Sequence, residues 1–196
     1  VEWGYEEDGA TLLAHLEKIV QYNVQSSEKE KFDGVMLDIE PYISDSWKEN
    51  PEEYMDRYIS CMKKGYKFAQ KNHLRTAICI PRHYDNQGLT SGLEELIKET
   101  CDEVAVMNYS CGNEIEAIRT EAALSEKYGK ELHCILEFQE VGKHGLTENK
   151  TYRNKGIDNA KETWEKLQKE YKNINVTRDY HWSRPVREML EEKNAD

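Results

Sequence analysis

The chain has little positive charge and no long apolar run. Asp and Glu outnumber Lys and Arg by 38 to 27 over 196 residues, which gives a formal net charge of -11. No basic patch is expected to offset phosphate repulsion, so we predict no nucleic-acid partner and no anionic membrane partner. No apolar stretch is long enough to span a bilayer, and no signal peptide is visible.

Cysteine and glycine motifs are also missing. The five cysteines form no Cys-x-x-Cys pair and no cluster with the six histidines, so we predict no metal site, no cofactor and no disulfide framework. No glycine-rich turn follows any expected strand, which excludes a dinucleotide-binding fingerprint and a phosphate-binding loop. No Gly/Ser linker divides the chain, so we expect a single domain over 1–196.

Strand and helix patterns alternate instead along the chain. Period-two and apolar runs predict strands at 32–40, 75–80, 103–109, 132–138 and 174–182. Helical spacing predicts helices at 11–23, 51–72, 113–127, 152–171 and 185–191, and Ser91 to Glu94 has the pattern of a capping box that opens a further helix. Residues 1–5 are predicted to be the end of another strand. This alternation is typical of βαβ units and a parallel sheet.

Polar and aromatic residues gather where the predicted strands end. They are Asp38 and Glu40, Arg82 and Tyr84, Asn108 and Tyr109, Glu137 and Gln139, and His181 and Trp182. Sites assembled from several strand ends are typical of (β/α)8 barrels, which usually need about 250 residues. We therefore predict an α/β fold of the partial TIM-type (β/α) barrel class. It would be about two βα units short of eight at its N-terminal side, as in a fragment of a longer chain.

Segment 32–42, with the sequence FDGVMLDIEPY, contains the main candidates for catalytic residues. Side chains along a strand alternate between its faces, so Met36, Asp38 and Glu40 share one face. The two carboxylates then lie roughly 6.5–7 Å apart, a distance at which each acid can affect the protonation of the other. Such a pair can supply one proton donor and one ionised carboxylate.

This segment resembles the fourth-strand signature of family 18 glycoside hydrolases and their barrel relatives, in which Asp-Gly leads into Asp-x-Asp-x-Glu. The sequence Met107-Asn108-Tyr109 is similar to the Met-x-Tyr that ends their sixth strand. Trp182 matches the tryptophan on the last strand that forms the floor of their sugar site. The resemblance covers roughly the whole chain and is to a bacterial branch in which Glu-Pro follows the motif.

The resemblance implies hydrolysis or binding of glycans that contain N-acetylhexosamine. Glu40 would protonate the glycosidic oxygen, and Asp38 would orient the 2-acetamido group that serves as the internal nucleophile. Tyr109 would hydrogen-bond the same acetamido group, and Trp182 would stack under the sugar ring. Further candidate substrate contacts stand at or beside the strand ends: Met36, Tyr42, Arg82, Asn108 and Glu137.

Met36 departs from the family pattern. It replaces the first Asp of Asp-x-Asp-x-Glu, so Asp38 lacks the neighbour with which it shares a proton or a hydrogen bond in the family. Ser110 also stands where the family often has Asp. These departures keep open a second interpretation, in which the chain is an inactive relative that binds carbohydrate without turnover.

A third interpretation uses a different pair of carboxylates. In a large clan of retaining barrel glycosidases, an acid/base Glu ends the fourth strand and a nucleophilic Glu ends the seventh. Glu40 and Glu137 would take these places, with carboxyl groups about 5–5.5 Å apart. Ile39, however, stands where that clan has Asn.

The expected partners follow from the incomplete barrel. Its two open strand edges, expected near Trp3 and Val176, should pair, be covered or aggregate. A homo-oligomer through these edges is one expected outcome, and a glycan is the expected ligand. The compartment cannot be determined from the sequence, although the family resemblance favours an extracellular or cell-envelope location.

Overall fold

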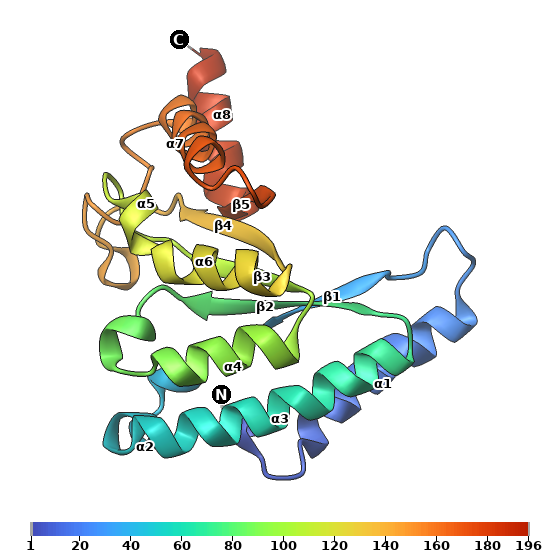
Figure 1. Cartoon of the computed structure of the whole chain (residues 1–196). Coiled ribbons are helices and arrows are strands. Elements are labelled where there is room, and N and C mark those ends of the chain that lie inside the picture. Colours follow the sequence, from blue (N-terminus) through green and yellow to red (C-terminus); the bar gives the residue numbers. More distant parts are fainter. Residues whose placement is uncertain (1, 196) are drawn as a thin grey trace. The chain divides into compact units, whose positions relative to one another are not determined.

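The structure is a computed structural model that describes residues 2–195, so Val1 and Asp196 lie outside the described residues. It is a mixed α/β fold in which parallel strands alternate with helices, as the sequence predicts (Figure 1). The sheet order follows the chain: β1 (Gly34–Asp38), β2 (Arg75–Pro81), β3 (Glu103–Met107), β4 (Glu131–Glu137) and β5 (Val176–His181). The chain divides into two compact units, Val1–Val104 and Ala105–Asp196.

The first unit packs four α-helices and short 3-10 turns around β1 and β2. The elements are η1 (Glu2–Tyr5), α1 (Ala10–Gln25), η2 (Pro41–Ile43), α2 (Asp45–Glu49), α3 (Pro51–Lys71), η3 (Asp85–Gln87) and α4 (Thr90–Thr100). Helix α3 packs against α1 and α4, which run beside it in Figure 1. Gly65 of α3 permits the close approach of α1, because a Cβ at Gly65 would lie 2.5 Å from Cδ2 of Leu12.

Strand β1 pairs in parallel with β2, in a register that sets Gly34 beside Arg75. A Cβ at Gly34 would lie 2.8 Å from the carbonyl oxygen of Arg75, so the glycine permits this pairing distance. The predicted alternation is confirmed for Met36 and Asp38, whereas Glu40 lies beyond the end of β1. The Met36 side chain is 50% exposed and Asp38 is exposed, whereas Ile39 is buried.

The second unit contains the rest of the sheet and the C-terminal helices. Its elements are α5 (Glu114–Ala117), α6 (Arg119–Tyr128), η4 (Lys143–Gly145), α7 (Ile157–Glu170) and α8 (Ser183–Ala195), with β4 and β5 paired in parallel. The buried Trp164 of α7 donates its indole N–H to the carbonyl of Cys134 at 2.9 Å. Its ring also contacts Phe138 and Tyr180, so α7 covers one face of β4 and β5.

Some local predictions were wrong. Residues Glu2–Tyr5 form a 3-10 helix rather than the end of a strand. The physical reason is that this turn places Gly4 against Ile39, so closely that a Cβ at Gly4 would lie 2.4 Å from Cγ2 of Ile39. Ser91 does not cap a helix, because α4 begins at Thr90 and its N-cap residue makes no side-chain hydrogen bond.

Two predicted helices have different limits in the structure. The helix predicted at 113–127 is divided into α5 and α6 at Ile118, whose φ of -126° is not helical and whose side chain is fully buried. The helix predicted at 152–171 begins only at Ile157, after Gly156 with a φ of 88°. Among residues 2–195, no helix is both long and apolar enough to cross a bilayer.

Candidate functional site

In the first unit, the carboxyl end of β1 carries Asp38 and Glu40 as the sequence predicts. Asp38 is the last residue of β1, and Glu40 immediately precedes the 3-10 turn η2. The Tyr42 hydroxyl donates a hydrogen bond to Oε1 of the half-buried Glu40. Burial and this contact raise the pKa of Tyr42 well above its usual value, so the hydroxyl keeps its proton and acts as the donor. Tyr42 therefore orients the Glu40 carboxyl group.

The Tyr42 side chain packs against a cluster of aromatic rings. Its ring meets His83 edge-on at a centroid distance of 5.2 Å and Tyr84 at 6.1 Å, and the buried Trp47 lies 5.6 Å from Tyr84. Burial, together with the neighbouring Arg82 cation, lowers the pKa of His83, so this imidazole is neutral at pH 7. The packing restricts the Tyr42 ring to one orientation.

Met36 cannot provide the acidic neighbour that Asp38 lacks in the sequence. Met36 lies on the same face of β1 as Asp38, with its thioether half exposed. A thioether neither shares a proton nor donates a hydrogen bond to a carboxylate. Asp38 therefore receives no acidic neighbour from this position.

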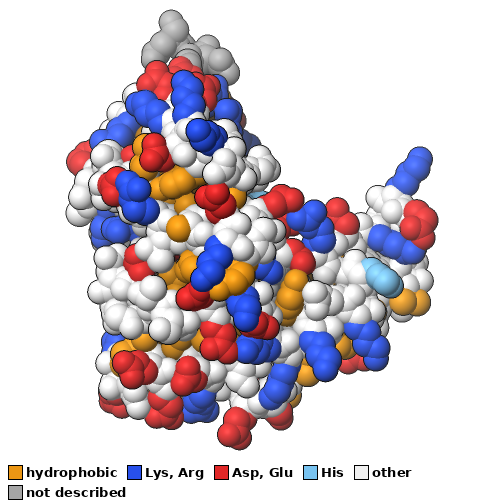
Figure 2. Space-filling view, in the orientation of Figure 1, with side chains coloured by type: hydrophobic (Ala, Val, Ile, Leu, Met, Phe, Trp, Pro, Cys, Tyr) orange, Lys and Arg blue, Asp and Glu red, His pale blue; other side chains and the backbone are white. Residues whose placement is uncertain are grey.

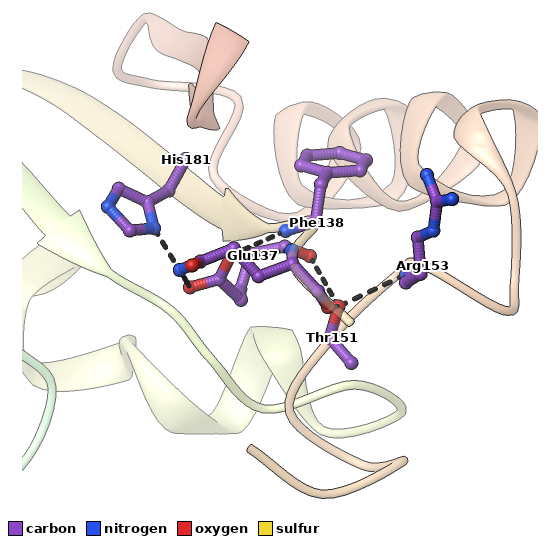
Figure 3. Close-up of polar contacts among 6 residues, drawn as sticks. Glu137, Phe138, Thr151, Arg153 and His181 are labelled. Atoms are coloured by element: carbon purple, nitrogen blue, oxygen red, sulfur yellow. Dashed lines mark hydrogen bonds and ion pairs between the residues drawn. The ribbon is translucent and has the colours of Figure 1, made fainter. Parts of the chain in front are cut away.

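In the second unit, Glu137 ends β4 with its side chain only 2% exposed. The backbone N–H groups of Phe138 and Gln139 both donate to its Oε1 at 2.8 Å (Figure 3). Its Oε2 lies 2.8 Å from Nδ1 of His181 and accepts a 3.2 Å bond from the Gln139 side chain. Burial raises the pKa of Glu137, but the bonds from His181 and Gln139 outweigh this effect. The pKa lies below its usual value, so Glu137 is ionised at neutral pH.

Strand register explains why Glu137 meets His181. The two residues stand opposite each other in the β4–β5 ladder and are the last residues of their strands. A second histidine–carboxylate pair lies on the same face, with Nδ1 of His133 3.0 Å from Oδ2 of Asp179. The sequence analysis placed both residues at strand ends but did not predict their pairing. The signal was their equivalent position at the ends of successive strands.

The other substrate contacts predicted in the second unit, Tyr109, Trp182 and Asn108, differ in their exposure to solvent. The Tyr109 ring lies 5.9 Å from the His181 ring with a tilt of 32°, and Trp182, directly after β5, is 45% exposed. Asn108 is only 1% exposed, and its amide donates to the carbonyl of Glu114 at 2.9 Å. Asn108 therefore fixes the start of α5 from within the packed interior.

A cleft of about 740 Å³ in the second unit is lined by α5, α7 and the loops beside them, and the described residues that line it include none of the predicted site residues. The Glu114 carboxylate at its wall accepts the Gly112 backbone N–H at 2.8 Å and the Tyr152 hydroxyl. Burial raises the pKa of the Cys111 thiol to about 11, which makes it a poor nucleophile at neutral pH. Glu114, Gly112 and Tyr152 thus bind one another at the wall of this cleft.

Comparisons with protein-family models, with curated proteins and with solved structures found no match for this chain. Its function is therefore inferred from the geometry of the strand-end residues.

Proposed function

We propose that this chain is a partial (β/α) barrel of the family 18 glycoside hydrolase type that acts on N-acetylhexosamine-containing glycans. The observation that carries the proposal is the placement of Asp38 and Glu40 at the carboxyl end of β1, with Tyr42 bonded to Glu40. Carboxyl ends of parallel strands are where barrels build their sites. Acidic and basic side chains are mixed over the face of the molecule drawn in Figure 2.

In the proposed reaction, Glu40 donates its proton to the glycosidic oxygen as the C1–O bond breaks. The carbonyl oxygen of the 2-acetamido group attacks C1 from the other side, and Asp38 accepts a hydrogen bond from the acetamido N–H. Water then opens the cyclic intermediate while Glu40 takes the proton back. The Tyr42 hydroxyl keeps the Glu40 carboxyl group oriented through both steps. Tyr109 and the exposed Trp182, which belong to the second unit, are proposed as sugar contacts on the family resemblance alone.

The retaining alternative, with Glu137 as the nucleophile, is poorly supported. Glu137 is almost fully buried, and both of its oxygens accept hydrogen bonds from Phe138, Gln139 or His181. A nucleophilic carboxylate must reach the anomeric carbon, and its nucleophilicity falls as donors surround it. A binding protein without turnover is the stronger alternative, because Met36 leaves Asp38 without its acidic neighbour.

A turnover assay with chitooligosaccharides and peptidoglycan-derived fragments tests the proposal. Glu40→Gln should lower the rate by roughly 10²–10⁴-fold, because the proton donor is lost. The control is Glu49→Gln, the same change at an exposed position of α2, which should leave the rate unchanged.

The outcomes separate the candidates. Full activity in Glu40→Gln would contradict the proposed function. Calorimetric binding of the same glycans by the wild-type protein and Glu40→Gln, with no turnover in either, would support the binding protein instead.

A further inference from the structure

The cleft of the second unit has a buried carboxyl group in its wall. Its volume of about 740 Å³ lies within the range of roughly 300–1,000 Å³ that is usual for small-molecule sites. The walls come from α5 and α7, which pack against each other, and from the loops beside them (Figure 1). Glu114, the first residue of α5, lines the cleft although it is only 8% exposed. A buried carboxyl group needs hydrogen-bond partners, so its contacts show what it is placed to bind.

One oxygen of Glu114 is fully engaged by the protein. Oε1 accepts the Gly112 backbone N–H at 2.8 Å and the Tyr152 hydroxyl. Burial and the contact with Glu114 raise the pKa of Tyr152 well above its usual value, so its hydroxyl keeps the proton and is the donor. The Thr163 hydroxyl, 2.8 Å from the Tyr152 oxygen, then donates to Tyr152 in turn. The Asn108 amide also holds the backbone carbonyl of Glu114 at 2.9 Å, so the carboxyl group has one fixed orientation.

The other oxygen of Glu114 has no partner. Within residues 2–195, Oε2 accepts no hydrogen bond and forms no ion pair. Glu114 is not among the described residues whose unpartnered polar atoms are fully enclosed, so Oε2 reaches open space. Because Glu114 lines the cleft, this oxygen is accessible from the cleft. The fold thus holds a free acceptor, in a fixed orientation, at the wall of a cavity large enough for a ligand.

The charge of the cleft indicates what this acceptor binds. The charged side chains of the lining are Glu114, Glu116, Glu162, Glu170, Lys155 and Lys166, so negative charge exceeds positive charge. Among the described residues, no set of three His, Cys, Asp or Glu ligand atoms converges in this cleft, which disfavours a metal ion. An ammonium group supplies both a hydrogen and the compensating charge, and such charge-assisted hydrogen bonds are the strong ones.

We propose that Oε2 of Glu114 binds the ammonium group of a small organic amine in this cleft. The inference goes beyond the proposed glycan chemistry and does not depend on it, because none of the described residues that line the cleft is assigned a role in that chemistry.

Calorimetric titration of the wild-type protein with three four-carbon compounds tests the preference for an amine. Putrescine carries an ammonium group at each end, butane-1,4-diol carries neutral hydroxyl groups, and succinate carries carboxylates. Putrescine should bind at least about tenfold more tightly than the diol, since its hydrogen bond to Glu114 is charge-assisted. Equal binding of the diol and putrescine would overturn the inference. Tighter binding of succinate would also overturn it, because the lysines would then determine the ligand.

Glu114→Gln tests the contact itself. The carboxamide keeps an oxygen toward Gly112 and Tyr152, so its NH₂ group takes the place of Oε2 and faces the ammonium group. The Kd for putrescine should rise about 10–100-fold, which corresponds to the loss of one hydrogen bond to a charged group. The matched control is Glu165→Gln, which removes the same charge from an exposed position of α7 outside the cleft lining. It should leave the Kd unchanged, and an equal rise in both variants would show only a general attraction to the acidic chain and would overturn the inference.

The position of the bound amine can be measured in the wild-type protein, even if Glu114→Gln does not fold. In ¹⁵N–¹H NMR spectra, putrescine should shift the amide signal of Gly112, whose N–H donates to Glu114. The amide of Gly129, which ends α6 outside the cleft lining, should not shift. Saturable binding that leaves the Gly112 signal in place, or an unchanged Kd in folded Glu114→Gln, would overturn the inference.

Discussion

Replacing Glu137 by alanine should strongly destabilise the carboxyl end of β4. The change leaves the N–H groups of Phe138 and Gln139 and Nδ1 of His181 without their acceptor, at a site where the carboxylate is 2% exposed. A donor left without its acceptor costs about 1–3 kcal/mol, so the loss at the two backbone amides together costs about 3–5 kcal/mol. For a chain of this size, 1 kcal/mol lowers Tm by roughly 2–4 °C, so we expect a fall of roughly 10 °C.

Thermal unfolding followed by circular dichroism measures this cost, and amide hydrogen exchange locates it. The amides of Phe138 and Gln139 should exchange faster in Glu137→Ala. Glu137→Gln keeps one oxygen for these two amides, so its cost should be only about 1–2 kcal/mol. Equal stability of the alanine and glutamine variants would refute the reasoning, because it would mean that the backbone amides gain nothing from the Glu137 oxygen.

Because the pKa of Glu137 is lowered in the folded protein, the free energy of unfolding should depend on pH. Its pKa in the folded protein is lower than the ordinary value of 4.5. The unfolded chain therefore takes up this proton first as the pH falls, and folding loses the contribution of Glu137 between pH 4.5 and the lower folded pKa. Glu137→Gln lacks this contribution at every pH. The stability difference between the wild type and Glu137→Gln should thus shrink on acidification from pH 7, and a constant difference would show that the carboxylate is not held in its ionised form.

Two further predictions concern packing in the first unit. Gly65→Ala should lower the free energy of unfolding by about 1 kcal/mol, measured by thermal unfolding. Overpacking against the buried Leu12 costs about 1–3 kcal/mol, which exceeds the helix propensity that alanine adds. A stabilised variant would contradict this close approach of α1 and α3. Thr76→Val should raise stability by about 1 kcal/mol in urea unfolding, because within residues 2–195 the buried Thr76 hydroxyl has no hydrogen-bond partner. Its backbone bonds with Asp102 do not involve the hydroxyl, so a loss of stability would show that the hydroxyl does have a partner.

The sequence predicted the order of elements because their periodicities are strong. The helix predicted at 11–23 is Ala10–Gln25, and the one predicted at 51–72 is Pro51–Lys71. The first residues were mistaken for a strand because five residues are too few to show a period. Their 3-10 turn depends on the contact of Gly4 with Ile39, which lies far away in the sequence. Local pattern cannot reveal such a contact.

The sequence predicted the arrangement of candidate site residues only where they lie on the same strand. Alternation along β1 correctly placed Met36 and Asp38 on one face, because the rule concerns neighbours in one segment. The pairing of Glu137 with His181 depends instead on the register between two strands. A slip of one residue would have placed Tyr180 or Trp182 beside Glu137. The equivalent position of Glu137 and His181 at their strand ends suggests the pair, but strand ends predicted from sequence are not precise to one residue.

The two strand-end glutamates suit opposite tasks. Glu40 is half-buried and accepts one hydrogen bond from the Tyr42 hydroxyl, which fits the proton-donor role proposed for it. Glu137 is buried and bonded to two backbone amides and His181, so protonating it would disrupt several bonds at once. A side chain that gains and loses a proton during a reaction needs protonated and ionised forms of similar free energy. A side chain that orients a neighbour must instead stay in one protonation state. Within the proposed function, Glu40 is therefore the candidate proton donor, whereas Glu137 is a fixed carboxylate beside His181.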